Sequence, residues 1–179
     1  MEFGFAPDSA GLWRASLYMT VVGSTFSRIP LSAFDAIRDD FALLDDWEDR
    51  YRYVIELGQG LEPLPPEAHS DVNKVRGCVS QVWLEREARA DAAGQPVLHF
   101  RGDSDSHLVR GLIAIALALF SDRPPREILA TDAHGAFRAL GLEQHLTPQR
   151  SNGVRAMIER IRADAAAALA PAQGAAAAL

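Results

Sequence analysis

The chain contains one cysteine, Cys78, and its position directly after Gly77 makes it the first candidate for chemistry. A cysteine thiolate is a strong nucleophile, and a glycine before it allows a positive φ and leaves room for another molecule to approach the sulfur. Lys74 and Arg76 lie just before it, and nearby positive charge favours the thiolate. A lone cysteine is nevertheless more often a small buried packing residue. These residues alone therefore leave both interpretations open.

Histidines are the residues that could complete a site around this cysteine. The chain has five, His69, His99, His107, His134 and His145. None stands at a short metal-binding spacing from Cys78 or from another histidine, so we expect no metal site. One cysteine also cannot form an internal disulfide or hold an iron–sulfur cluster, which takes about four ligands. A Cys/His hydrolase stays open at this point, because its histidine need only lie close in space.

Two further polar groups stand farther along the chain. Asp103, Ser104 and Asp105 lie where a helix is predicted to begin, and carboxylates there stabilise a helix through capping and its dipole. They would make a weak cation site, since no further acids are near. Arg150 precedes the predicted last helix. It is either an ordinary loop residue or a donor that holds a carboxylate or thiolate in place.

The composition narrows the class of protein that positions these residues. The chain has 179 residues, of which 48% are hydrophobic and 23% charged, as in one globular domain with tails. The net charge of −6 argues against nucleic acid as the main partner, because phosphate binding needs a concentrated basic surface. The most apolar stretch, 112–120, is far shorter than the roughly 20 residues that span a bilayer, so we expect no membrane association. The lone cysteine and the lack of a secretory pattern favour the cytoplasm.

Hydrophobic periodicity predicts helices in the first third of the chain. Residues 1–31 show no sustained period and are expected to form a poorly ordered extension. A first helix begins after Ser32, its predicted N-cap, and a second begins after Asp46 and ends near Gly58. Their inward faces carry Phe34, Ile37, Phe41, Leu44, Trp47, Tyr51, Val54 and Ile55.

The period then changes to two, which is typical of strands. Alternation over 78–84, a turn-like segment at 91–96 and a second apolar run at 97–100 predict an antiparallel hairpin. Further helices are predicted at 106–120, 126–129, 135–140 and 152–169. The helix at 106–120 is expected to lie against the hairpin, with Cys78 where a loop enters the first strand.

Four segments, taken in order, carry a family resemblance. They read W-E-D-R-Y-R-Y-V-I-E-L-G at 47–58, N-K-V-R-G-C-V-S-Q-V-W-L at 73–84, G-D-S-D-S-H-L-V-R-G-L-I-A at 102–114 and H-L-T-P-Q-R-S-N-G-V-R-A-M-I at 145–158. They resemble the SufE proteins of iron–sulfur cluster assembly and the related CsdE. The resemblance implies an α+β fold like that of the IscU scaffolds, a small curved antiparallel sheet packed with helices. The SufE-like domain would span 32–165, followed by an alanine-rich tail at 166–179.

The resemblance also implies a function for Cys78. Family members accept sulfane sulfur from a SufS- or CsdA-type cysteine desulfurase as a transient persulfide on this cysteine, stimulate that enzyme, and deliver sulfur to a SufBCD-type scaffold. The chain would then be a sulfur-transfer accessory protein rather than an independent enzyme, with no bound cofactor. Asp105 and Arg150 match family positions linked to desulfurase docking or thiol support, and Gly77 precedes the acceptor. Val79 stands where the family commonly has glutamine.

Two alternatives come from other classes of protein. A regulatory module would dock on a cysteine desulfurase and modulate it without carrying sulfur. An IscU-like cluster scaffold needs several cysteines, and this chain has one. The sequence leaves open which desulfurase is the partner and whether the chain forms a homodimer.

Overall fold

The computed structural model describes residues 33–170, and the predicted extension at 1–31, with the predicted cap Ser32, lies outside the described residues. Six α-helices, two strands and two short 3-10 helices follow one another over this range. They are α1 (Ala33–Ala42), α2 (Trp47–Gln59), η1 (Pro66–Ala68), β1 (Val82–Ala90), β2 (Pro96–Ser104), α3 (His107–Phe120), α4 (Pro125–Ala130), α5 (Ala133–Ala139), η2 (Leu142–Gln144) and α6 (Pro148–Leu169). The α+β class implied by the resemblance is confirmed.

The sheet is an antiparallel hairpin of two strands within the described part of the chain. Its register runs from Val82 opposite Ser104 to Ala90 opposite Pro96. Asp91 closes the turn, because its carboxylate accepts the backbone N–H groups of Ala93 and Gln95. The hairpin prediction is confirmed, but β2 is longer than predicted and β1 begins only at Val82. The alternation over 78–81 was therefore wrongly assigned to a strand.

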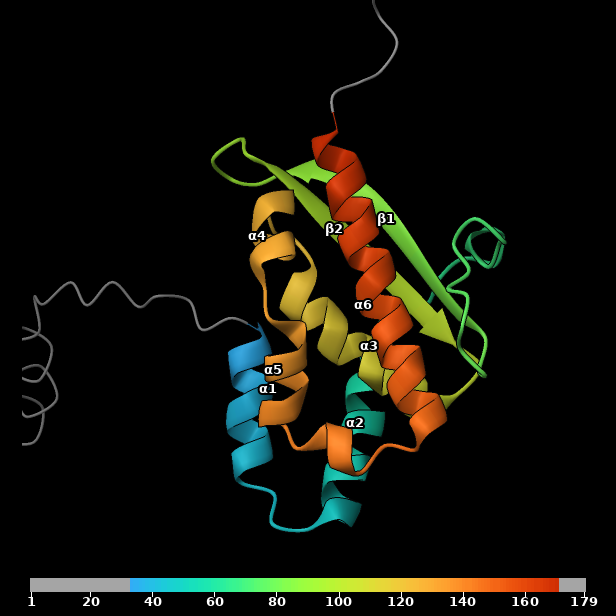
Figure 1. Ribbon diagram of the computed structural model, residues 1–179, viewed down its shortest axis with the longest axis vertical. Helices are drawn as coiled ribbons and strands as arrows, with labels where there is room; N and C mark the ends of the chain where they lie inside the picture. The colour runs from blue at the N-terminus through green and yellow to red at the C-terminus, as the bar shows by residue number, and fades with distance from the viewer. Residues whose placement is uncertain (1–32, 171–179) are drawn as a thin grey trace, which may run out of the picture. The chain divides into compact units, whose positions relative to one another are not determined.

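Helix α3 forms the centre of the domain. Helices α1, α2 and α6 and strand β2 all pack against it, and α6 lies across the hairpin in Figure 1. Its apolar sequence explains this position, since nine of its residues are buried, among them Leu112, Ile113 and Ile115. The largest fully buried side chains of the other elements include Phe100 from β2, Ile128 from α4, and Met157 and Ile161 from α6.

Two glycines let α2 and α3 cross closely. A Cβ on Gly111 would lie 1.9 Å from the carbonyl oxygen of Val54, and one on Gly58 would lie 2.6 Å from the backbone nitrogen of Gly111. Helix α2 ends at Gln59, close to the predicted end near Gly58. Gly58 itself does not end the helix but lies inside it, where a side chain would push the two helices apart.

The helix starts agree with the sequence in part. Asp46 caps α2 as predicted, by accepting the N–H of Asp49 at 2.9 Å. Ser106, and none of the three candidates before it, caps α3. Helix α6 starts at Pro148 rather than at residue 152, because proline is well suited to the first turn of a helix. Arg150 therefore lies in the first turn of α6 and not in a loop. No helix within residues 33–170 is long and apolar enough to cross a membrane.

Candidate functional site

Cys78 lies on a short loop whose two ends are joined by backbone hydrogen bonds. The N–H of Val75 donates to the carbonyl of Val82 at 2.9 Å, and the N–H of Leu84 donates to the carbonyl of Asn73 at 2.7 Å. Residues 73–75 thus return alongside β1, and residues 76–81 project from the sheet. This explains why Cys78 is presented on a loop and not on a strand.

Gly77 gives the loop its sharp bend before the cysteine. Its φ is +95°, a conformation that side chains rarely allow, so the predicted need for glycine at this position is met. A Cβ on Gly77 would lie 3.7 Å from the Cβ of Ala156. The backbone just before Cys78 therefore runs close to α6.

Asp105 holds the other side of the loop. Its Oδ1 accepts the backbone N–H of Gln81 at 3.0 Å. Asp105 was predicted as a cap for α3, but Ser106 serves as that cap and frees Asp105 to reach across to the loop. A residue singled out for docking thus also supports the segment that carries the thiol.

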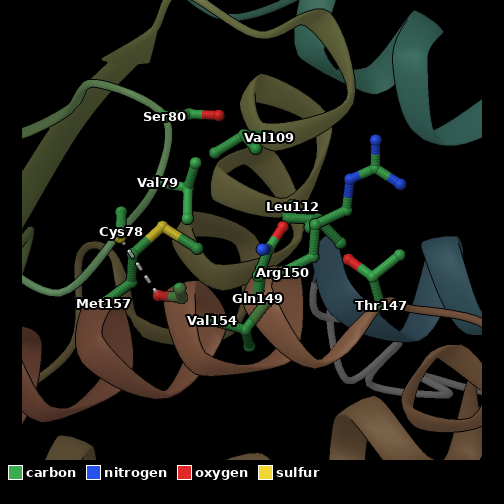
Figure 2. Close-up of a pocket in the computed structure, with 11 residues that line it drawn as sticks. Cys78, Val79, Ser80, Val109, Leu112, Thr147, Gln149, Arg150, Val154 and Met157 are labelled. Atoms are coloured by element: carbon green, nitrogen blue, oxygen red, sulfur yellow. Dashed lines mark hydrogen bonds between the residues drawn. The ribbon is translucent and has the colours of Figure 1, made fainter.

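The Cys78 thiol opens onto a pocket of about 210 Å³ between the loop, α3 and α6. Its apolar lining comes from Val109 and Leu112 on α3 and from Val154 and Met157 on α6. Its polar lining comes from Ser80 on the loop and from Thr147, Gln149 and Arg150 around the start of α6. Figure 2 shows Met157 and Val79 beside the cysteine, and Thr147 and Arg150 at the opposite end of the pocket. The loop and two helices distant in sequence therefore build one cavity.

The thiol is partly buried and faces α6. Cys78 Sγ lies 3.6 Å from the carbonyl oxygen of Gly153, a distance at which the S–H donates a weak hydrogen bond (Figure 2). Partial burial raises the pKa of the Cys78 thiol above its ordinary value, and Lys74 and Arg76 do not offset this effect. The net shift is therefore opposite to the one expected from these two charges. In the isolated chain the protonated thiol predominates at neutral pH.

Arg150 lies at the far end of the same pocket. Its side chain is exposed, and Figure 2 shows its guanidinium pointing away from Cys78. Within residues 33–170 it forms no hydrogen bond or ion pair with the thiol or with Asp105. Its placement therefore suits contact with another molecule better than support of the resting thiol.

Val79, directly after the cysteine, is 75% exposed and lines the mouth of the pocket. An exposed valine at such a position is unusual, since most large apolar side chains of the domain are buried. The pocket mouth is thus apolar on one side and bears Arg150 on the other.

A Cys/His hydrolase does not fit this arrangement. All five histidines lie among the described residues, and no histidine lines the Cys78 pocket or forms a hydrogen bond with the thiol. His69 and His99 each pair with an aspartate elsewhere. Over the same residues there is also no group of three or more potential metal-ligating side chains. A general base for Cys78 is therefore not supplied by a histidine of this part of the chain.

Sequence reasoning missed Gly153, Val154 and Met157, which form the α6 side of the pocket. The available signal was a glycine inside a helical pattern, which usually has a packing reason. What the sequence could not show is that this glycine faces Cys78.

Comparisons with known proteins are consistent with this geometry. A family model described as "SufE: Fe-S metabolism associated domain" matches residues 35–165. A SufE-like protein of Rhizobium etli, described as uncharacterized, is 52% identical over 138 residues, which cover 77% of this chain and 93% of that protein. A SufE-like protein of Rhizobium meliloti, also described as uncharacterized, is 53% identical over 135 residues, covering 75% of this chain and 96% of the relative.

A solved structure shows the same fold. The solution structure of a hypothetical protein from Thermus thermophilus matches with a TM-score of 0.60 and 20% identity, over 76% of this chain and 96% of that one. At this level of identity the likeness concerns the fold alone.

Proposed function

Because the chain belongs to the SufE family and so has a role in Fe–S metabolism, we propose that it accepts sulfane sulfur on Cys78 from a SufS- or CsdA-type cysteine desulfurase. It stimulates that enzyme and delivers the sulfur to a SufBCD-type assembly scaffold. The observation that carries this proposal is the placement of Cys78. A thiol on a projecting loop, above a pocket and beside an exposed Val79, can meet a partner's sulfur.

The transfer follows thiol–disulfide exchange. The Cys78 thiol loses its proton, and the thiolate attacks the terminal sulfur of the donor's cysteine persulfide. A new S–S bond forms on Cys78 while the S–S bond of the donor breaks, and the donor cysteine leaves as a thiolate. The sulfane sulfur changes carrier, and no external oxidant or reductant is needed.

The resting geometry supports activation by docking. Burial raises the pKa of the thiol, so the isolated chain holds little thiolate at neutral pH. A partner that draws the loop toward its own active site would remove the thiol from the apolar pocket and lower its pKa. Sulfur acceptance would then be restricted to the docked complex.

The docking surface in this proposal is the rim of the pocket. Val79 offers apolar contact beside the sulfur, and Arg150 offers a cation without an internal partner among residues 33–170. Asp105 holds the loop and is itself exposed. Charges at such a rim act mainly on register and on the rate of association.

The alternative is the regulatory module, which docks on the desulfurase but carries no sulfur. The partial burial and raised pKa of Cys78 are the observations that favour it. It shares the docking surface with the carrier and differs only in the fate of the thiol.

Intact-mass spectrometry separates the two functions. The chain is mixed anaerobically with a cysteine desulfurase and cysteine, without reductant, and is expected to gain the mass of one or more sulfur atoms. The Cys78→Ser variant should gain none and should no longer stimulate the enzyme, since a serine hydroxyl cannot hold sulfane sulfur. An unmodified wild-type chain that still stimulates the desulfurase would support the regulatory module instead.

A further inference from the structure

Gly153 is an unexpected residue for its position. It is buried within α6, where glycine is the least favourable residue after proline. Its backbone is not among those with positive φ, so conformational freedom does not explain it. The reason for a glycine here must be the space that a side chain would fill.

That space belongs to Cys78. A Cβ on Gly153 would lie 3.4 Å from Cys78 Sγ and 3.9 Å from Cys78 Cβ. Apart from the chain neighbours of Gly153 and the backbone of α6, these are the only heavy atoms of the described structure within 4 Å of that position. The missing side chain therefore faces the sulfur and nothing else.

The loop has little freedom to move away from such a side chain. Gly77 brings the loop backbone close to Ala156 on α6, and Asp105 holds the N–H of Gln81. The ends of the loop are joined to each other by the bond from Val75 to Val82. If a side chain at residue 153 pressed against Cys78 Sγ, the cysteine side chain would most easily relieve the contact by rotating outward to solvent.

We propose that Gly153 is a positioning residue for the Cys78 sulfur, and that its bare backbone forms the seat in which this sulfur turns inward against α6. The Gly153 carbonyl holds the thiol hydrogen in this position. If the chain carries sulfur as proposed above, the same seat leaves room for the terminal sulfur of the persulfide inside the pocket. A methyl group at residue 153 would just reach contact distance from the sulfur, and a larger side chain would displace the sulfur outward.

The first test uses the chain alone and does not depend on the proposed function. The rate of Cys78 alkylation by iodoacetamide is measured for wild type, Gly153→Ala and Gly153→Val. Asn152→Ala and Asn152→Val are the matched controls, because Asn152 is the exposed neighbour on the same helix and does not line the pocket. We expect a small rise in the rate for alanine and a larger one for valine, by roughly threefold for each unit by which the pKa of the thiol falls, because the thiolate fraction rises tenfold while the nucleophilicity of the thiolate decreases. The controls should match wild type.

Equal or slower alkylation of both Gly153 variants would overturn the proposal. A double-mutant cycle covers the case in which Gly153→Val does not fold. Gly153→Ala should raise the melting temperature more in a Cys78→Ala background than in wild type, because alanine favours the helix and the sulfur is then absent. An equal rise in both backgrounds would show that residue 153 and the sulfur do not interact.

A second experiment concerns the persulfide. Chains loaded by a desulfurase and cysteine are purified and treated with dithiothreitol, which converts Cys–S–SH to Cys–SH and H₂S while the dithiol becomes a cyclic disulfide. Gly153→Ala should release sulfide faster than wild type and Asn152→Ala. Equal rates of release would show that the terminal sulfur of the persulfide does not lie against Gly153. If wild type is never loaded while alkylation still depends on residue 153, the carrier function fails and the seat for the thiol stands.

Discussion

Asp105 accepts the backbone N–H of Gln81 at 3.0 Å and so ties the start of α3 to the loop that carries Cys78. The two residues are 24 positions apart in the chain, and the bond fixes where the loop enters β1. The Asp105 carboxylate therefore has two possible roles, to accept this hydrogen bond and to carry a negative charge that a partner could recognise.

Substitution of Asp105 should separate these roles. Asp105→Ala leaves the Gln81 N–H without its acceptor, loosens the loop, and should raise the alkylation rate of Cys78 while lowering stability by about 1 kcal/mol. Asp105→Asn keeps an acceptor oxygen, so alkylation should stay near wild type while affinity for the desulfurase changes in a salt-dependent way. Asp45→Ala is the control for charge, since Asp45 is exposed on a different loop. Alkylation equally fast in Asp105→Asn and Asp105→Ala would show that the charge, not the hydrogen bond, holds the loop.

Cys78→Ser should leave the fold intact. The serine hydroxyl is smaller than the thiol and the position is only partly buried, so water can solvate the hydroxyl and the variant should lie within about 1 kcal/mol of wild type at neutral pH. Chemical denaturation followed by circular dichroism measures this. A loss nearer ~3 kcal/mol would mean that the hydroxyl is buried without a partner and that Cys78 is a packing residue.

Ionisation of Cys78 should lower the free energy of unfolding of wild type at alkaline pH. Burial raises the pKa of the folded thiol above its unfolded value, so the stability that the protonated thiol contributes is fully present below the unfolded pKa of about 8.5. It is lost as pH rises through the folded pKa, because the unfolded chain ionises first. Cys78→Ser lacks this titration, so the stability of wild type relative to the variant should fall above about pH 8.5. A constant difference from pH 7 to 10 would contradict the raised pKa.

Gly111→Ala should damage the core. Its Cβ would lie 1.9 Å from the Val54 carbonyl oxygen, so α2 and α3 would have to separate, at a cost of roughly 3 kcal/mol or more. Gly60→Ala is a suitable control, because Gly60 is exposed at the end of α2 with a φ of −76°. Thermal unfolding should show a large fall in melting temperature for Gly111→Ala and little change for Gly60→Ala. Similar values for both would mean that the crossing can adapt.

Residues 1–31 should be dispensable for folding and for sulfur acceptance. Their sequence shows no hydrophobic periodicity, and the match to the family model begins only at residue 35. A chain that starts at Pro30 should keep its melting temperature and its rate of sulfur acceptance. A clear loss in either measurement would show that this segment contributes to the domain.

Much of the fold followed from local patterns. The 3.6-residue period placed the helices, the two-residue period placed the hairpin, and Asp46 and Asp91 were recognisable as a cap and a turn residue, since these signals depend only on neighbours in the chain. The family resemblance singled out Cys78, Asp105 and Arg150. Composition alone limited the chain to one thiol.

The tertiary structure decided what surrounds that thiol. Residues 78–81 alternate like a strand, but the hydrogen bonds of Val75 with Val82 and of Asp105 with Gln81 turn them into a projecting loop. Lys74 and Arg76 are neighbours of Cys78 in sequence, yet the pKa of the thiol is raised, because the fold partly buries it. Gly153 could be seen only as a glycine in a helix until the fold placed it against Cys78 Sγ. Contacts between distant segments depend on how helices and loops pack, and no period in the sequence encodes them.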